Sequence, residues 1–164
     1  MARSELFHVG IVVPDIEAAT RRFTELLGTE WGPVVEMPNT FRWANGDDVT
    51  LPNFKMCYSR SGPHLELIEE KPGSPWVCNE HSNLHHIGFY SDTVVPSSEK
   101  LTSLRCPLEI TGHDPESDAN IWWYHRDPLG VRIEFIDHQF MQVMNDMMFD
   151  GAAAIDAPVI VPGL

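Results

Sequence analysis

Two histidines and two glutamates recur along the chain in the order His, Glu, His, Glu. Each histidine stands two residues before a glycine, and each glutamate interrupts a short run of aliphatic and aromatic residues. Two imidazoles and two carboxylates suit a divalent metal ion of intermediate softness: Zn, Ni, Co, Mn or Fe(II). The four residues are His8, Glu66, His86 and Glu134.

All four residues are expected in mid-strand positions that turn their side chains to one side of a sheet. Side chains alternate across a sheet, so His8 shares one face with Val12 while Val9, Ile11 and Val13 form an aliphatic face opposite. The aliphatic face is expected to pack on helices, which leaves His8 on the concave side. A mid-strand carboxylate such as Glu66 is costly to bury unless it is paired or bound to a metal.

The elements that must position these residues follow the order β-α-β-β-β. A helix begins after Asp15, a good N-cap, and ends at Gly28, a natural stop. Residues 38–53 are mostly polar and are expected to form a loop or lid. The strands of this half are expected at residues 6–13, 31–37, 54–59 and 64–69.

The second half of the chain is expected to repeat this order. A helix is predicted at residues 97–104, and a polar loop at residues 113–119. The predicted strands lie at residues 84–90, 107–111, 121–125 and 131–136.

The repeat predicts an α+β fold in which two tandem βαβββ modules form a curved mixed sheet around a concave metal-binding cavity. We expect one domain over residues 1–164. Its parts are module one at about residues 6–70, a linker at 71–83, module two at about 84–137 and a C-terminal extension at 138–164.

The extension carries an apolar stripe that predicts a helix over about residues 139–149. The stripe consists of Phe140, Val143, Met144, Met147 and Met148. One interpretation is that the helix covers the core. The other is that it seals a subunit interface or one end of the substrate cavity.

Composition narrows the choice of partners. The net charge is −13 with only 11 Lys and Arg residues, which argues against nucleic acid and anionic membranes. The three cysteines form no CxxC pair, which favours free thiols in a reduced compartment. No apolar run is long enough to span a membrane, and the start of the chain has no signal-peptide pattern. We therefore expect a cytoplasmic protein.

Four motifs in this order resemble the vicinal oxygen chelate superfamily, which includes glyoxalase I, methylmalonyl-CoA epimerase, extradiol dioxygenases and bleomycin-resistance proteins. The resemblance covers about residues 7–137 and implies one divalent metal ion held by His8, Glu66, His86 and Glu134. It also implies a small-molecule substrate and pairing into a homodimer. The motifs are His8-Val9-Gly10-Ile11-Val12-Val13-Pro14-Asp15, Leu65-Glu66-Leu67-Ile68-Glu69, His85-His86-Ile87-Gly88-Phe89 and Asp127-Pro128-Leu129-Gly130-Val131-Arg132-Ile133-Glu134-Phe135.

Three further groups bear on the site. His64, two residues before Glu66, faces the same cavity by alternation and is either a proton-transfer group or a histidine in water at the rim. His85 is expected to point to the opposite face from His86. The aromatic residues either line a pocket for a bulky apolar substrate or belong to the core: Phe41, Trp43, Trp76, Trp122, Trp123 and Tyr124.

The resulting prediction is a metal-dependent lyase or isomerase that stabilises an enolate of a carbonyl compound. Glu134 or Glu66 is the expected catalytic base, with His64 as a further catalytic candidate. Epimerases of the family carry an extra acidic residue in the strand after the first helix, where this chain offers only Glu36. The alternatives are an Fe(II) ring-cleaving dioxygenase and a non-catalytic small-molecule-binding protein.

Overall fold

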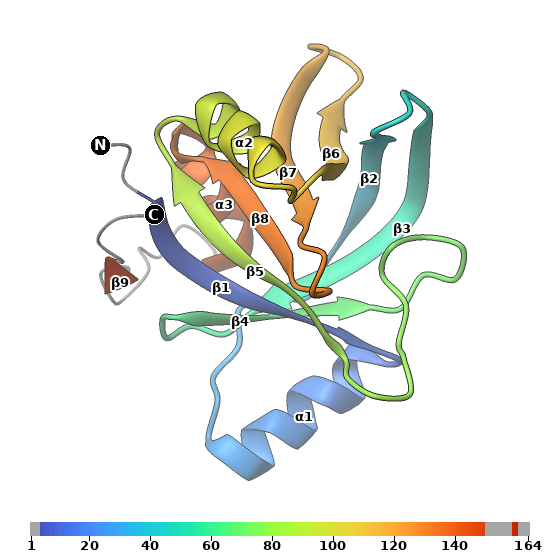
Figure 1. Cartoon of the computed structure of the whole chain (residues 1–164). Coiled ribbons are helices and arrows are strands. Elements are labelled where there is room, and N and C mark those ends of the chain that lie inside the picture. Colours follow the sequence, from blue (N-terminus) through green and yellow to red (C-terminus); the bar gives the residue numbers. More distant parts are fainter. Residues whose placement is uncertain (1–3, 150–158, 161–164) are drawn as a thin grey trace.

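The computed structural model describes residues 4–149 and 159–160. Residues 4–137 form two consecutive β-α-β-β-β units (Figure 1). The first unit contains β1 (Ser4–Val13), α1 (Ile16–Leu27), β2 (Val35–Trp43), β3 (Asp48–Tyr58) and β4 (His64–Glu69). The second contains β5 (Leu84–Ser91), α2 (Val94–Ser103), β6 (Leu108–Asp114), β7 (Ala119–Arg126) and β8 (Arg132–Asp137). A 3-10 turn, η1 (His138–Phe140), helix α3 (Met141–Phe149) and the short strand β9 (Val159–Ile160) follow.

The strands form one nine-stranded sheet in the order β4-β3-β2-β6-β7-β8-β5-β1-β9. Because β4 also pairs with β1, the sheet closes on itself. Within each unit the first and last strands are parallel, as in β1–β4 and β5–β8. The two units meet at two antiparallel pairings, β1–β5 and β2–β6. The predicted α+β fold with a curved mixed sheet is confirmed.

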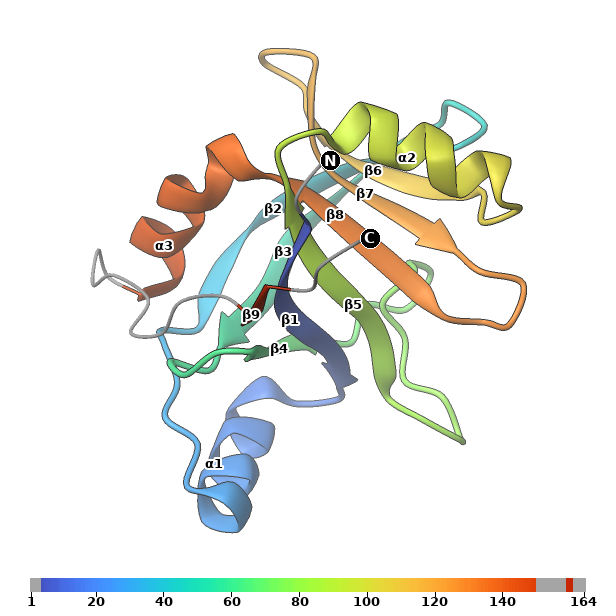
Figure 2. The same cartoon turned by 60° about the vertical axis from the view of Figure 1, so that its left-hand side comes forward.

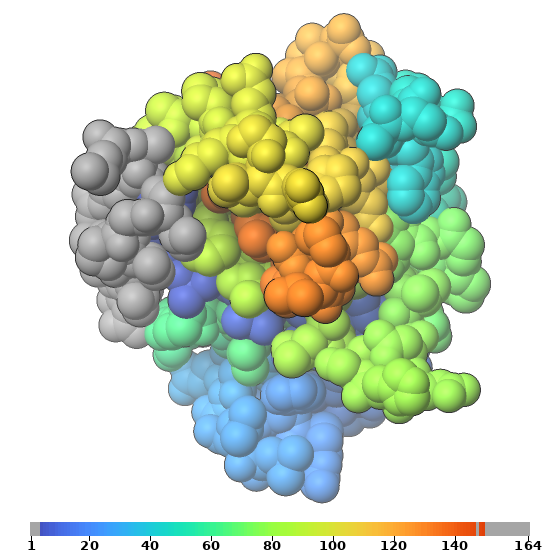
Figure 3. Space-filling view, in the orientation of Figure 1, coloured from blue at the N-terminus to red at the C-terminus, as the bar shows by residue number. Residues whose placement is uncertain are grey.

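Helices α1 and α2 cover the outer side of the sheet. Helix α1 packs on β4 through a small cluster that includes Ile16 and Leu67. Helix α2 packs on β7 and β8, and its yellow atoms lie against the orange atoms of this part of the chain in the space-filling view (Figure 3). As predicted, the Asp15 side chain caps α1 by accepting a hydrogen bond from the Ala18 amide, and Gly28 ends the helix in the left-handed conformation. None of the helices in the described part of the chain is long and apolar enough to cross a membrane.

The larger hydrophobic core lies on the inner side of the sheet and combines the strands with the linker and the C-terminal helix. Trp76 of the linker is 1% exposed and packs against Phe41 and Phe54. The three cysteines are free, as their spacing predicted.

The loop predicted at residues 38–53 is wrong, because these residues form most of the β2–β3 hairpin. Polar pairs across the two strands replace the apolar alternation that marks a half-buried strand. The Thr40 and Thr50 hydroxyls lie 2.9 Å apart, and Arg42 forms an ion pair with Asp48 at 2.7 Å. Cross-strand hydrogen bonds therefore stabilise a strand pair that looks like a loop in sequence.

Other predicted boundaries also move. The strand expected at residues 31–37 begins only at Val35, and Trp31 makes an isolated bridge to Ser59. Most of the loop expected at 113–119 is a short turn, because β6 continues to Asp114 and β7 begins at Ala119. Helix α2 begins at Val94 rather than at residue 97, and β1 begins at Ser4.

The predicted helix of the C-terminal extension is present as η1 and α3, beside a part of the sheet that neither α1 nor α2 covers (Figure 2). Met148 and Phe149 are at most 2% exposed and join the inner core, whereas Val143 of the predicted stripe is 58% exposed. The helix thus covers the inner core, and the subunit-interface interpretation stays a prediction. The remainder of the extension, apart from β9, lies outside the described residues.

The burial of Phe149 leads to a stability prediction. Phe149→Ala removes a buried ring beside Tyr58 and His64 and should lower the free energy of unfolding by about 3–5 kcal/mol, measured by urea denaturation. The matched control Val143→Ala changes an exposed position of the same helix and should shift it by less than about 0.5 kcal/mol. Equal unfolding midpoints for the two variants would show that α3 does not contribute to the core.

Candidate metal centre

The pairing of β1 with β5 explains why each histidine stands two residues before a glycine. His8 lies opposite Gly88, and Gly10 lies opposite His86. A Cβ atom on Gly10 would lie 2.0 Å from Cε1 of His86, and one on Gly88 would lie 2.2 Å from Cε1 of His8. Each glycine therefore leaves the space that the histidine ring of the other unit occupies.

The flanking parallel strands bring the glutamates to the same place. Glu66 on β4 lies beside Gly10, and Glu134 on β8 lies beside Gly88. Two rows of neighbouring residues thus cross the strands side by side. One runs from Glu66 through Gly10 to His86, and the other from His8 through Gly88 to Glu134. Side chains at neighbouring positions on one face of a sheet are close enough to touch.

The four predicted side chains converge on one point in the structure. The Nε2 atoms of His8 and His86 lie 2.7 Å apart. Glu134 Oε2 lies 2.9 Å from His8 Nε2 and 3.2 Å from His86 Nε2. Glu66 Oε2 lies 3.5 Å and 3.1 Å from the same two nitrogens. All four residues are at most 5% exposed, so this is a buried cluster of donor atoms.

The donors of this cluster fit a divalent metal ion. His8, Glu66 and His86 each offer a ligand atom within 4.8 Å of the others, and Glu134 Oε2 adds a fourth. Neither Glu66 Oε2 nor Glu134 Oε2 has a partner with hydrogen-bond geometry among the described residues. Buried carboxylate oxygens are normally paired, and a cation between the four side chains would satisfy both.

The charges of the cluster are strongly coupled. Burial lowers the pKa of His86, but the charges of Glu134 and Glu66 outweigh it and raise that pKa to about 9. Burial raises the pKa of Glu134, but His86 and His8 outweigh it and lower that pKa to about 2. Because a metal needs a neutral imidazole, metal binding must release the His86 proton and should strengthen as the pH rises.

Sequence comparison places this chain in a known family. A sequence profile of the Glyoxalase/Bleomycin resistance protein/Dioxygenase superfamily matches residues 7–120, which are most of the chain. The chain belongs to this superfamily. No curated protein matches it in sequence.

Solved structures share the superfamily fold at low sequence identity. The hypothetical protein BH1468 from Bacillus halodurans C-125 is 18% identical with a TM-score of 0.58, over 82% of this chain and 94% of that one. A methylmalonyl-CoA epimerase from Mycobacterium tuberculosis is 14% identical with a TM-score of 0.53, over 81% of this chain and 87% of that one. At these identities the likeness shows the fold alone.

Tyr58 is part of the site and was missed by the sequence analysis. Its hydroxyl donates a 2.5 Å hydrogen bond to Glu66 Oε1, which leaves Oε2 directed at the histidines. Burial and then the charge of Glu66 raise the pKa of Tyr58, so the hydroxyl stays a donor. Tyr58 lies opposite Glu66 just as Tyr124 lies opposite Glu134. Aligning the two units by tyrosine as well as by glutamate would have found this pair.

His64 lies next to His8 in the β1–β4 pairing and is buried rather than at a water-exposed rim. Its Nδ1 lies 2.5 Å from the carbonyl oxygen of Ser59, and its ring packs against Phe7 and Phe149. These contacts fix the ring near the cluster. Its role in proton transfer stays a prediction.

The aromatic residues largely belong to the inner core that surrounds the cluster. Phe41, Trp76 and Tyr124 are buried there, and Trp43 and Trp122 pack against them. Trp123 is half-buried and is not part of this core. Most of these aromatic residues therefore pack in the core, and a substrate pocket lined by some of them stays a prediction.

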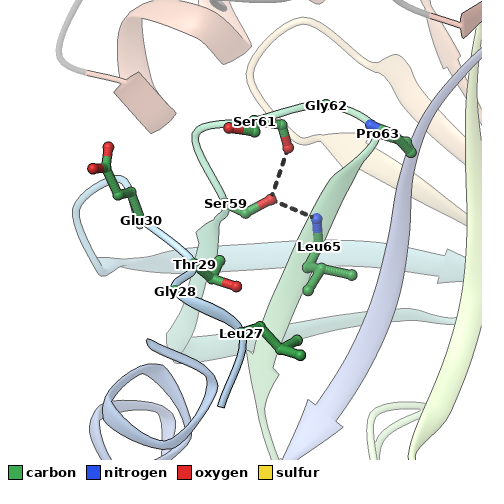
Figure 4. Close-up of a pocket in the computed structure, with 9 residues that line it drawn as sticks. All are labelled: Leu27, Gly28, Thr29, Glu30, Ser59, Ser61, Gly62, Pro63 and Leu65. Carbon is green, nitrogen blue, oxygen red and sulfur yellow. Dashed lines mark hydrogen bonds between the residues drawn. The ribbon is translucent and has the colours of Figure 1, made fainter. Parts of the chain in front are cut away.

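A pocket at the surface lies elsewhere. It is formed where the end of α1 approaches the β3–β4 turn, and it includes Glu30, Ser59 and Leu65 (Figure 4). The Ser59 hydroxyl is bonded within the turn and accepts from the Leu65 amide. None of the five predicted site residues lines this pocket.

The contact between histidine and glycine across β1–β5 can be tested with a single methyl group. Gly88→Ala should displace the His8 ring, lower the melting temperature by several degrees and weaken divalent-metal binding. Metal titration and thermal denaturation measure the two effects. Gly62→Ala is the control, because the nearest atom to its added Cβ is His64 Nε2 at 3.7 Å, an ordinary contact. Wild-type metal affinity in Gly88→Ala would contradict the arrangement.

Proposed function

We propose that this protein is a divalent-metal-dependent lyase or isomerase that acts on the carbon next to a carbonyl group. His8, Glu66, His86 and Glu134 are the proposed metal ligands. The supporting observation is the convergence of these four buried side chains, two of which carry a carboxylate oxygen without a hydrogen-bond partner in the described structure.

Different residues of the chain are proposed to bind the metal ion, to move the proton and to orient the base. A bound divalent ion, of Zn, Ni, Co, Mn or Fe, would supply Lewis-acid stabilisation of negative charge on the carbonyl oxygen. Glu66 or Glu134 is the proposed base that moves the proton, and its neighbours set its orientation. Tyr58 holds Glu66 through Oε1, so that Oε2 is the oxygen free to act. Trp76 and Phe149 are buried in the inner core beside Tyr124 and Tyr58, and they make the surroundings of the cluster apolar.

Several features favour a neutral, apolar carbonyl compound as the substrate. The surroundings of the cluster are aromatic, and the chain has only 11 Lys and Arg residues to bind a polyanionic tail. Glu36, the one candidate for the second acid of an epimerase, is exposed on β2 while its neighbours Val35 and Met37 pack against the inner core. These observations favour a reaction other than methylmalonyl-CoA epimerisation.

A ring-cleaving Fe(II) dioxygenase is the second candidate, since two histidines and one carboxylate would make its facial triad. The position of Glu66 argues against it, because a fourth ligand 3.1 Å from His86 Nε2 would occupy a site that dioxygen needs. A non-catalytic binding protein is the third candidate, and four intact donors argue against it. A homodimer and a cytoplasmic location stay predictions.

The metal site gives a direct prediction. Purified protein loaded with Co²⁺ should hold about one ion per chain, and His86→Ala should lose most of it, because one ligand of a small set is gone. Elemental analysis after gel filtration measures the content. His81→Ala, which changes an exposed histidine, is the matched control. A wild-type protein that binds no divalent ion under any loading, or full retention by His86→Ala, would rule out the proposed site.

The reaction class gives a second prediction. In D₂O, the metal-loaded protein should replace the hydrogen on the carbon next to the carbonyl of small apolar hydroxyketones with deuterium. Proton NMR measures the rate of this exchange. Glu66→Ala should reduce this exchange by about 10²–10⁴-fold, because a positioned base contributes that much. Oxygen uptake with catechols should be absent after Fe(II) loading. Rapid uptake in the wild type would instead assign the protein to the dioxygenases.

A further inference from the structure

His85, the residue before the proposed ligand His86, does not point to the opposite face as strand alternation predicted. The β1–β5 register shifts between Gly10–His86 and Ile11–Leu84, so His85 is an extra residue at a bulge. A bulge re-aims the side chains of its strand. The corresponding residue of the first unit, Phe7, lies at an equivalent bulge between Leu6 and His8.

The bulge places His85 between a main-chain carbonyl and the ring of His86. Nε2 of His85 lies 3.0 Å from the carbonyl oxygen of Pro75, and Nδ1 lies 2.9 Å from Nδ1 of His86. A carbonyl oxygen can only accept, so Nε2 of His85 carries a proton and donates it. The ring of His85 packs against Trp76, Tyr124 and His86, and within the described residues its side chain forms no ion pair with a carboxylate.

These contacts determine which nitrogen of His86 is free. His85 is half-buried, and a charged ring there would have no counter-ion, so the neutral ring with an unprotonated Nδ1 is favoured. That Nδ1 accepts the proton on Nδ1 of His86. The proton of a neutral His86 is thereby kept on Nδ1, and the lone pair stays on Nε2, the atom that faces Glu66 and Glu134.

Two further contacts affect which nitrogen of neutral His86 carries the proton. The Tyr124 hydroxyl lies 3.5 Å from Nδ1 of His86 and could donate there, which would favour the wrong tautomer. His85 is 0.6 Å closer and is the stronger partner. Its own acceptor is held in place, because the Ser74 hydroxyl accepts from the Trp76 amide and donates to the Lys71 carbonyl.

The first unit provides an internal comparison. Nδ1 of His8 is buried and has no hydrogen-bond partner among the described residues, and the bulge residue beside it is Phe7, which cannot offer one. The two histidines of the cluster therefore differ in the partner of Nδ1: His86 has the ring of His85, and His8 has none among the described residues. We infer that His85 is a positioning residue that holds His86 with Nε2 ready to bind the metal ion, an inference that rests on the proposed metal site.

The test compares the Co²⁺ affinities of two variants of His85. Each affinity is measured by titrating the protein with Co²⁺ and recording the visible absorption. His85→Leu removes the acceptor and should weaken Co²⁺ affinity by about 10–100-fold, as loss of a partner behind a ligand usually does. His85→Asn keeps an oxygen near the position of Nδ1 and should stay within a few-fold of the wild type. Phe7→Leu, at the equivalent bulge, should also stay within a few-fold and controls for packing.

A second readout begins with the wild type, where it does not depend on how well any variant folds. In the Zn²⁺-loaded wild type, nitrogen-15 NMR should show a His86 Nδ1–H that exchanges slowly with water because it is buried and bonded. His85→Asn should keep this signal, and His85→Leu should lose it or exchange it faster.

The outcomes separate this inference from the proposed function. A wild-type chain that binds neither Co²⁺ nor Zn²⁺ would overturn the proposed function. A wild type that binds metal, with equal affinity in His85→Leu or with no protected Nδ1–H on His86, would overturn the role of His85 alone.

Discussion

The contact of two histidine rings with two glycines across the β1–β5 pairing constrains the rest of this structure. Each ring occupies the space that a Cβ on the facing strand would need, so the register between the two units is fixed at this point. A slip of one residue between the two strands would put the two rings on opposite faces of the sheet. The positions of β4 and β8 then follow, because β4 pairs with β1 and β8 pairs with β5. Each of these outer strands places its glutamate beside one of the two glycines.

Burying two imidazoles and two carboxylates in an aromatic core is costly, and the structure offsets the cost in two ways. Opposite charges face one another, and Tyr58 satisfies an oxygen that the cluster does not use. A buried ion pair is nonetheless weak support for stability, because well-packed apolar residues of similar size are often at least as favourable. The retention of four ionisable groups at this depth is better explained by a ligand that binds them, since binding to the folded state alone also stabilises it.

The sequence predicted the fold and the four converging residues because an internal repeat makes the same pattern twice. It could not predict the β2–β3 hairpin, where cross-strand polar pairs such as Arg42–Asp48 replace the apolar alternation on which strand prediction depends. Alternation also failed at His85, because a bulge is a property of two paired strands and not of either one alone. Tyr58 was missed because its importance comes from its place opposite Glu66 in the β3–β4 pairing, to which the repeat of a tyrosine in the two units was the one signal in the sequence.

The closed sheet has a consequence for how the chain folds as it is synthesised. Strand β1 leaves the ribosome first, yet its partners are β4, β5 and β9, so it cannot complete its pairing until late in synthesis. Contacts between residues this far apart in sequence slow folding, because the intervening chain must be ordered before they form. The cluster draws one residue from each of β1, β4, β5 and β8, and it therefore comes into being only when almost the whole chain has emerged. A chain that stops short of β8 therefore holds at most a fragment of the cluster, and the proposed metal site is complete only when β8 has paired with β5.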